Sequence, residues 1–184
     1  MKATTFKIEA NPSASWLETT RDYFQLTKPT ITLLVVVTAI PTLLMTEKGI
    51  PSFGLVLATL LGTWLASSSA GCFNQIIDFN IDARMKRTQS RPLVMGSVNQ
   101  VNALIFAGIL AILSFLTLTI FATLAAALFA LIANAFYVLF YTSFLKLRTH
   151  QNIVIGGAAG AVGPLIGWAA VTGTIGWPAW VLFL

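Results

Sequence analysis

Long runs without a charged residue constrain this chain more than any other feature of its sequence. Five such runs are 16 to 25 residues long: Thr30–Met45, Phe53–Cys72, Val101–Thr119, Phe121–Leu145 and Ile153–Val171. A helix needs about 20 largely apolar residues to cross the hydrocarbon core of a bilayer. The runs therefore predict an all-α, polytopic membrane helix bundle. We expect five complete transmembrane helices and a sixth helix that begins near Gly176.

The composition and the pattern of these runs exclude two other classes of fold. With 57% hydrophobic and 9% charged residues, the chain lacks the polar surface of a soluble globular protein. Its apolar residues are continuous, whereas the strands of a membrane β-barrel alternate apolar and polar residues. In lipid, such continuous segments can satisfy their own backbone hydrogen bonds only as helices.

The basic residues predict the orientation in the membrane. If the N-terminus is cytoplasmic, ten of the eleven Lys and Arg residues lie inside and only Lys48 lies outside. Cytoplasmic loops of membrane proteins carry such an excess of basic residues. The net charge of +5 therefore reflects topology, and no nucleic-acid partner is expected.

The segment before the first apolar run is expected to be distinct. We predict a cytoplasmic N-terminal segment over residues 1–29 and a transmembrane domain over residues 30–184. Ser15–Thr27 mixes aromatic and charged side chains, which predicts an amphipathic helix at the membrane interface. Three acidic residues lie in the N-terminal segment, whereas a mitochondrial presequence is poor in acids. The inner (plasma) membrane of a bacterium is the expected location.

A polar cluster follows the second apolar run. Asn74, Asp78 and Asp82 are spaced four residues apart, and no Gly or Pro occurs from Phe73 to Arg91, so the helix is expected to continue through them. Residues at this spacing share a helix face, about 6 Å apart along the axis. Two like charges on one face repel, and a divalent cation would reverse this effect. Ligands that are all oxygen atoms favour Mg²⁺, so these three residues are candidate metal ligands.

Basic residues beside this cluster predict a diphosphate site. Arg84, Lys86, Arg87 and Arg91 follow the aspartates directly. Guanidinium groups match phosphate oxygens bidentately, and Mg²⁺ usually completes its shell with phosphate. The next cytoplasmic loop adds further candidates, among them Tyr141 and Lys146. The alternatives are that the basic residues only anchor the cytoplasmic side, and that the aspartates lie on a solvated helix end.

Two features of the second half have simpler interpretations. His150 is the only histidine, and we expect it to be a plain loop residue. Gly156, Gly160, Gly163 and Gly167 form a stripe of small residues inside the fifth run, without the preceding strand of a nucleotide-binding loop. Small residues let helices approach closely. We expect close helix packing, and the alternative is a flat cavity wall for a bulky ligand.

The cluster resembles a known family. Membrane-bound UbiA-type prenyltransferases carry a first aspartate motif that is similar to Asn74-x3-Asp78-x3-Asp82, Met85, Arg87-Thr88 and Arg91-Pro92-Leu93. Residues 141–168 and the Thr27-Lys28-Pro29 segment resemble the members of that family that farnesylate haem. The resemblance covers nearly the whole chain.

The resemblance implies a fold, a reaction and residue roles. The family fold is a nine-helix bundle around a central cavity, with two aspartate motifs that bind Mg²⁺ and the prenyl diphosphate. The implied reaction transfers a farnesyl group from farnesyl diphosphate to a vinyl group of haem b, giving haem O. Asn74, Asp78 and Asp82 would hold the metal, and Asp78 and Asp82 would be the catalytic residues. The diphosphate would contact Arg87, Arg91, Tyr141 and Lys146.

The resemblance also has implications for partners and completeness. The implied partners are farnesyl diphosphate, haem b and the lipid bilayer, with an association with haem A synthase or cytochrome oxidase assembly. The sequence contains only the first of the two aspartate motifs. We therefore expect a truncated form of the fold, a fragment that does not transfer prenyl groups alone.

Three other functions are compatible with the residues. One is another UbiA-type prenyl transfer, to a quinone precursor or a chlorophyll-type acceptor. The second is transport, because ionisable residues inside helix bundles also mark ion pathways. Against transport, the acids lie at the cytoplasmic end and no internal repeat is evident. The third is an inactive fragment with a packing role.

Overall fold

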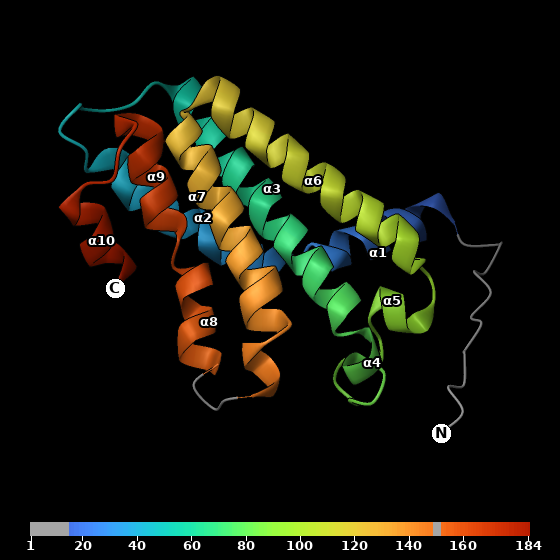
Figure 1. The fold of residues 1–184 in the computed structure, drawn as a ribbon. Helices are drawn as coiled ribbons and strands as arrows, with labels where there is room; N and C mark the ends of the chain where they lie inside the picture. The colour runs from blue at the N-terminus through green and yellow to red at the C-terminus, as the bar shows by residue number, and fades with distance from the viewer. Residues whose placement is uncertain (1–14, 149–151) are drawn as a thin grey trace.

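A computed structural model describes residues 15–148 and 152–184, and every regular element in these ranges is a helix (Figure 1). The α-helices are α1 (Trp16–Leu26), α2 (Pro29–Leu44), α3 (Phe53–Ile77), α4 (Phe79–Asp82), α5 (Pro92–Met95), α6 (Gln100–Phe121), α7 (Leu124–Ala135), α8 (Asn152–Gly160), α9 (Gly163–Thr172) and α10 (Trp177–Phe183). A π-helix, η1 (Phe136–Thr142), continues α7, and a short 3₁₀ helix, η2 (Leu145–Leu147), follows it.

Three helices in the described residues are long and apolar enough to cross a bilayer. They are α3, α6 and the continuous helix Leu124–Thr142 formed by α7 and η1, and they confirm the second, third and fourth expected spans. A fourth candidate is the pair of α1 and α2, which is bent by 51°. The expected sixth helix is also present, because α10 begins directly after Gly176.

The first and fifth expected spans are helical, but neither qualifies as an unbroken membrane span by itself. α2 has 16 residues and qualifies as a span only together with α1. The fifth run forms α8 and α9, which are separated by a turn at residues 161–162. Pro164 follows this turn and has no N–H to donate to the preceding helical turn. The described residues therefore contain three spans by this measure, or four with the bent pair, and not five.

The helix predicted to continue unbroken past the aspartates is interrupted. α3 ends at Ile77, Asp78 caps it, and α4 is a single turn that ends at Asp82. The chain then leaves the helix axis of α3. The Thr88 hydroxyl donates to the Asp82 carbonyl at 2.8 Å and stabilises this turn. The backbone N–H of Asp78 still donates to the Asn74 carbonyl at 2.9 Å, and that of Asp82 to the Asp78 carbonyl at 2.8 Å. These bonds keep the three polar side chains on one face.

Hydroxyl groups and small residues join the long helices. α3 runs beside α6 (Figure 1), and α2 packs on α9. The Ser114 hydroxyl donates to the Gly62 carbonyl at 2.7 Å, and the Ser69 hydroxyl donates to the Ala107 carbonyl at 2.9 Å. Such bonds between closely packed helices replace the hydrophobic effect, which does not drive helices together in lipid.

The glycine stripe packs against α2 at two of its positions. A Cβ on Gly163 would lie 2.6 Å from the carbonyl oxygen of Val35, and one on Gly167 would lie 2.5 Å from that of Ala39. A Cβ on Gly160 would meet no atom within 4 Å. The expected close packing is therefore confirmed for Gly163 and Gly167 and does not extend to Gly160.

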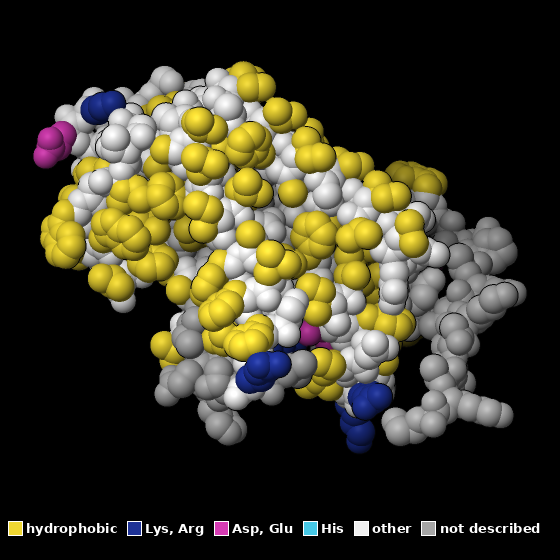
Figure 2. Space-filling model, viewed as in Figure 1, with side chains coloured by type: hydrophobic (Ala, Val, Ile, Leu, Met, Phe, Trp, Pro, Cys, Tyr) yellow, Lys and Arg dark blue, Asp and Glu magenta, His cyan; other side chains and the backbone are white. Residues whose placement is uncertain are grey.

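The surface is that of a membrane protein. Large apolar side chains cover most of the face in Figure 2, and Ile112, Ile120 and Leu139 are 62% to 68% exposed. Basic side chains gather at the lower end of the view, where α4 and α8 lie (Figures 1 and 2). At the N-terminal end of α1, Ser15 and Glu18 form a capping box, which confirms the helix expected over Ser15–Thr27. Its place at the membrane interface stays a prediction.

Candidate functional site

A polar cleft of about 530 Å³ lies at the end of the bundle where α3 passes into α4. Figure 2 shows acidic side chains set into a hollow there, beside basic ones. The charged and polar residues of the lining include Lys28, Asn74, Gln75, Asp78, Asp82, Arg87, Arg91, Tyr137, Tyr141 and Lys146. Its four basic side chains outnumber the two carboxylates, which favours an anionic ligand.

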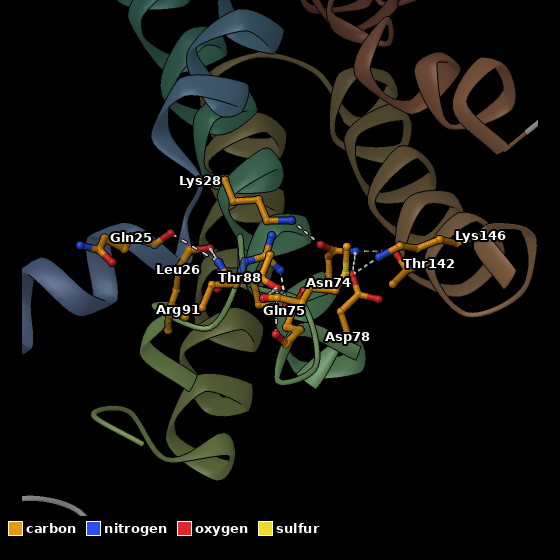
Figure 3. A network of polar contacts seen from close by, with 12 residues as sticks. Gln25, Leu26, Lys28, Asn74, Gln75, Asp78, Thr88, Arg91, Thr142 and Lys146 are labelled. Atoms are coloured by element: carbon orange, nitrogen blue, oxygen red, sulfur yellow. Dashed lines mark hydrogen bonds and ion pairs between the residues drawn. The ribbon is translucent and has the colours of Figure 1, made fainter. Parts of the chain in front are cut away.

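Asp78 is the centre of one half of the cleft. It is 2% exposed, and its Oδ2 accepts hydrogen bonds from Lys146 Nζ at 2.6 Å and Asn74 Nδ2 at 2.9 Å (Figure 3). Asn74 Nδ2 also donates to the Thr142 hydroxyl at 3.1 Å. A buried carboxylate without such partners would be strongly destabilising. The contacts therefore tie the end of α3 to η1 and the chain after it.

Asp82 is the centre of the other half. It is 3% exposed and forms an ion pair with Arg91. Arg91 precedes α5, and Pro92 occupies the first turn of that helix, where a missing backbone N–H costs nothing. Together with the hydrogen bond from Thr88 to the Asp82 carbonyl, the ion pair holds the loop of residues 83–91 beside the cleft.

Lys28 reaches the site from the junction of α1 and α2. Its Nζ donates to Asn74 Oδ1 (Figure 3). With φ 50° and ψ 61°, it is the only non-glycine residue with a positive φ in the described ranges, a conformation that costs about 1–2 kcal/mol. Burial, and then the nearby charge of Arg91, lowers the pKa of Lys28 to about 8. An anion bound in the cleft would favour the charged ammonium.

The π-helix η1 supplies the aromatic wall. The rings of Tyr137 and Tyr141 stack with their centroids 5.1 Å apart. The Thr142 hydroxyl donates to the Tyr137 carbonyl at 2.8 Å. Tyr141 also fills the space beside Gly156, where an added Cβ would lie 2.3 Å from the ring. π-helical turns inside α-helices occur frequently at functional sites, and here the turn contributes three residues to the site.

An apolar pocket inside the bundle adjoins the polar cleft. Lys28, Ile31 and Tyr137 line both. The rest of the pocket lining is mostly small and apolar, and includes Val35, Ala66, Ala70, Ala130, Ala133 and Gly160. The arrangement suits a ligand whose anionic head lies in the cleft and whose apolar chain enters the pocket.

The structure brings together the seven residues to which the sequence analysis gave a role in metal or diphosphate binding. Asn74, Asp78, Asp82, Arg87, Arg91, Tyr141 and Lys146 all line the polar cleft. Their individual roles stay predictions. Arg84 and Lys86 are exposed and are not part of the lining, and Arg148 lies 4.2 Å over the ring of Phe144. His150 lies outside the described residues.

The proposed metal ligands are hard oxygen donors. No group of three or more His, Cys, Asp or Glu side chains that could hold a metal occurs in the part of the chain that the structure describes. The ligands proposed from the sequence are Asp78, Asp82 and the Asn74 amide, and they stay a prediction. This set fits Mg²⁺, which usually retains waters and takes phosphate oxygens as further ligands. The two carboxylates also hold Lys146 and Arg91.

Sequence reasoning did not assign site roles to Lys28, Gln75, Tyr137 or Thr142. The spacing in the sequence could have indicated Tyr137, because it precedes Tyr141 by about one helical turn within the same apolar run. The sequence indicated Lys28 only weakly, as a basic residue just before the first span. Its contact with Asn74 joins residues 46 positions apart, and no local pattern indicates such a contact.

Comparison with known proteins gives a consistent result. Residues 35–184 match the UbiA prenyltransferase family. The chain is similar to a protein named protoheme IX farnesyltransferase from Paenarthrobacter aurescens (strain TC1), 46% identical over 187 residues that cover 100% of this chain and 58% of that protein. The protein of that name from Coxiella burnetii (strain RSA 331 / Henzerling II) is 52% identical over 172 residues, 94% of this chain and 55% of the relative.

A third protein with this name, from Gloeobacter violaceus, is 51% identical over 162 residues, 88% of this chain and 53% of the relative. The chain thus spans about half the length of the curated relatives it matches. No solved structure matches it.

Proposed function

The chain belongs to the UbiA prenyltransferase family, and on this premise we propose that it takes part in transferring a farnesyl group from farnesyl diphosphate to a vinyl group of haem b, giving haem O. The observation that carries the proposal is a polar cleft with an excess of basic side chains that adjoins an apolar pocket. The names of the relatives favour haem b over a quinone precursor as the acceptor.

The reaction begins with heterolysis of the bond between C1 of the farnesyl group and the diphosphate oxygen. The electron pair leaves with the oxygen, and positive charge develops on the allylic carbon. Arg87, Arg91 and Lys146 would donate hydrogen bonds to the diphosphate and stabilise its growing charge, and Tyr141 would donate a further one. The apolar pocket would keep water away from the cation. The vinyl group then forms a carbon–carbon bond with C1, and water adds to the resulting cation with loss of a proton.

Asn74, Asp78 and Asp82 would hold Mg²⁺, which when bound neutralises charge on the diphosphate. The two carboxylates have a second role that requires no metal. They hold Lys146 at 2.6 Å and Arg91 in an ion pair, so both cations are positioned at the cleft before a ligand arrives. Preorganised charges of this kind lose little energy to rearrangement during the reaction.

We expect the full gene product to form haem O in membranes of a strain that lacks its own haem O synthase. Chromatography and mass spectrometry of extracted haems, with an empty-vector control, provide the measurement. A parallel assay offers farnesyl diphosphate with a quinone precursor as the acceptor. Prenylation of the quinone precursor without formation of haem O would show that the acceptor is a quinone precursor and not haem b. Absence of both products would contradict the proposed function.

We also propose that the protein lies in a bacterial inner membrane with a cytoplasmic N-terminus, near haem A synthase or the cytochrome oxidase assembly machinery. The orientation is testable in a Cys72→Ser background, which removes the single cysteine. Cysteines replacing the exposed Lys48 and Lys86 should react with a membrane-impermeant maleimide from opposite sides, position 86 from the cytoplasm. Labelling of both from the same side would contradict the assignment.

A further inference from the structure

Lys28 has a unique place among the basic residues described here. It is the only one that lines both the polar cleft and the apolar pocket, whereas Arg87, Arg91 and Lys146 line the cleft alone. Its side chain points from the junction of α1 and α2 toward Asn74 (Figure 3). A cation at this junction lies where the charged head and the apolar chain of an amphiphilic ligand meet.

Three residues one turn apart on α3 hold the α1–α2 junction in place. The Ser67 hydroxyl donates to the Thr32 hydroxyl at 3.1 Å, and the Thr32 hydroxyl donates to the Thr27 carbonyl at 2.8 Å. One turn further, Gly71 leaves room for that carbonyl, since an added Cβ would lie 3.2 Å from its oxygen. The backbone before Lys28 is therefore pressed directly onto α3.

The third contact completes this arrangement. Gln75 is 3% exposed, and its Nε2 donates to the carbonyl of Leu26 at 3.0 Å and to that of Gln25 at 3.4 Å. These carbonyls lie in the last turn of α1, where helical i+4 partners run out, and that of Gln25 also accepts from the backbone N–H of Lys28 at 3.2 Å. The chain must then turn within two residues to begin α2 at Pro29. Lys28 takes the left-handed conformation at this point, and its side chain is directed into the cleft.

We propose that Lys28 is a substrate-binding residue that contacts the phosphate nearest the prenyl chain, and that Gly71 and Gln75 act through it as positioning residues. The proposal rests on the proposed function. When the bond between C1 and oxygen breaks, the electron pair and its negative charge move onto the oxygen nearest the apolar pocket. The Lys28 ammonium donates a hydrogen bond to that oxygen and needs to transfer no proton.

The test measures binding of inorganic pyrophosphate, in the presence of Mg²⁺, to the purified full gene product, and farnesyl transfer in parallel. Lys28→Met should weaken pyrophosphate binding at least about tenfold, the value expected for loss of a charged hydrogen bond. Lys28→Arg, which keeps the cation, should retain most of the binding. Lys86→Met is the matched control, because Lys86 is exposed on the same end and lies outside the cleft.

The positioning role has its own test. Gly71→Ala keeps the lysine but crowds the Thr27 carbonyl, and it should weaken pyrophosphate binding in the same direction as Lys28→Met. Gly108→Ala on α6, where an added Cβ meets nothing within 4 Å, should leave binding unchanged. Equal pyrophosphate affinity in Lys28→Met and wild type would overturn the inference. Wild type that binds no pyrophosphate at all would instead overturn the proposed function.

Discussion

Replacement of Asp78 with asparagine is expected to lower farnesyl transfer at least about 100-fold, the effect of removing one major electrostatic contact from a transition state. The change preserves the size of the side chain and removes its charge. Asp78 is buried and holds Lys146 at 2.6 Å, so the variant loses a proposed metal ligand and leaves a cation of the cleft without its carboxylate. Haem O formed per amount of membrane protein is the measurement.

A loss of activity in this variant could also arise from unfolding, because breaking a buried ion pair destabilises a protein by about 3–5 kcal/mol. Thermal denaturation in detergent micelles separates the two causes, and activity should be compared below the midpoints of both proteins. Asp22→Asn on α1 is the matched control, since Asp22 does not line the cleft. A wild-type rate of farnesyl transfer in folded Asp78→Asn would show that the aspartates only lie on a solvated end of α3 and take no part in the reaction.

Replacement of Gly163 with alanine is expected to destabilise the bundle, although alanine is the better helix former. The propensity term favours alanine by about 1 kcal/mol. The new Cβ would lie 2.6 Å from the Val35 carbonyl oxygen and 3.0 Å from the Ala39 backbone nitrogen. Backbone atoms cannot rotate away, so α9 must move off α2, and overpacking costs about 1–3 kcal/mol. The midpoint of thermal denaturation in detergent should fall.

Gly160 provides a control within the same stripe of glycines. An added Cβ at this position meets no atom within 4 Å, so Gly160→Ala should leave the thermal midpoint unchanged or raise it slightly. Equal stability of Gly163→Ala and Gly160→Ala would mean that α2 and α9 do not pack as closely as the structure indicates.

Local patterns in the sequence were sufficient for the helices and for much of the site. Hydropathy identified α3, α6 and the α7–η1 helix because a membrane span requires a minimum length of apolar chain. The four-residue spacing of Asn74, Asp78 and Asp82 placed them on one face, and the interruption after Ile77 did not move them from it. The same patterns did not indicate the bend between α1 and α2 or the turn that divides the fifth run, since hydropathy does not register the turns before Pro29 and Pro164.

The sequence by itself determined that the chain is a membrane helix bundle and identified seven of the residues that line its polar cleft, because hydropathy, charge and helical spacing are properties of neighbouring residues. Only the tertiary structure decided how those residues pair. Lys28 meets Asn74 across 46 residues and Lys146 meets Asp78 across 68, and both contacts depend on how α2, α3 and η1 pack. The left-handed backbone of Lys28 has the same origin, since α3 holds the carbonyls on its N-terminal side. Contacts between distant segments follow from the packing of whole helices, which no local pattern in the sequence records.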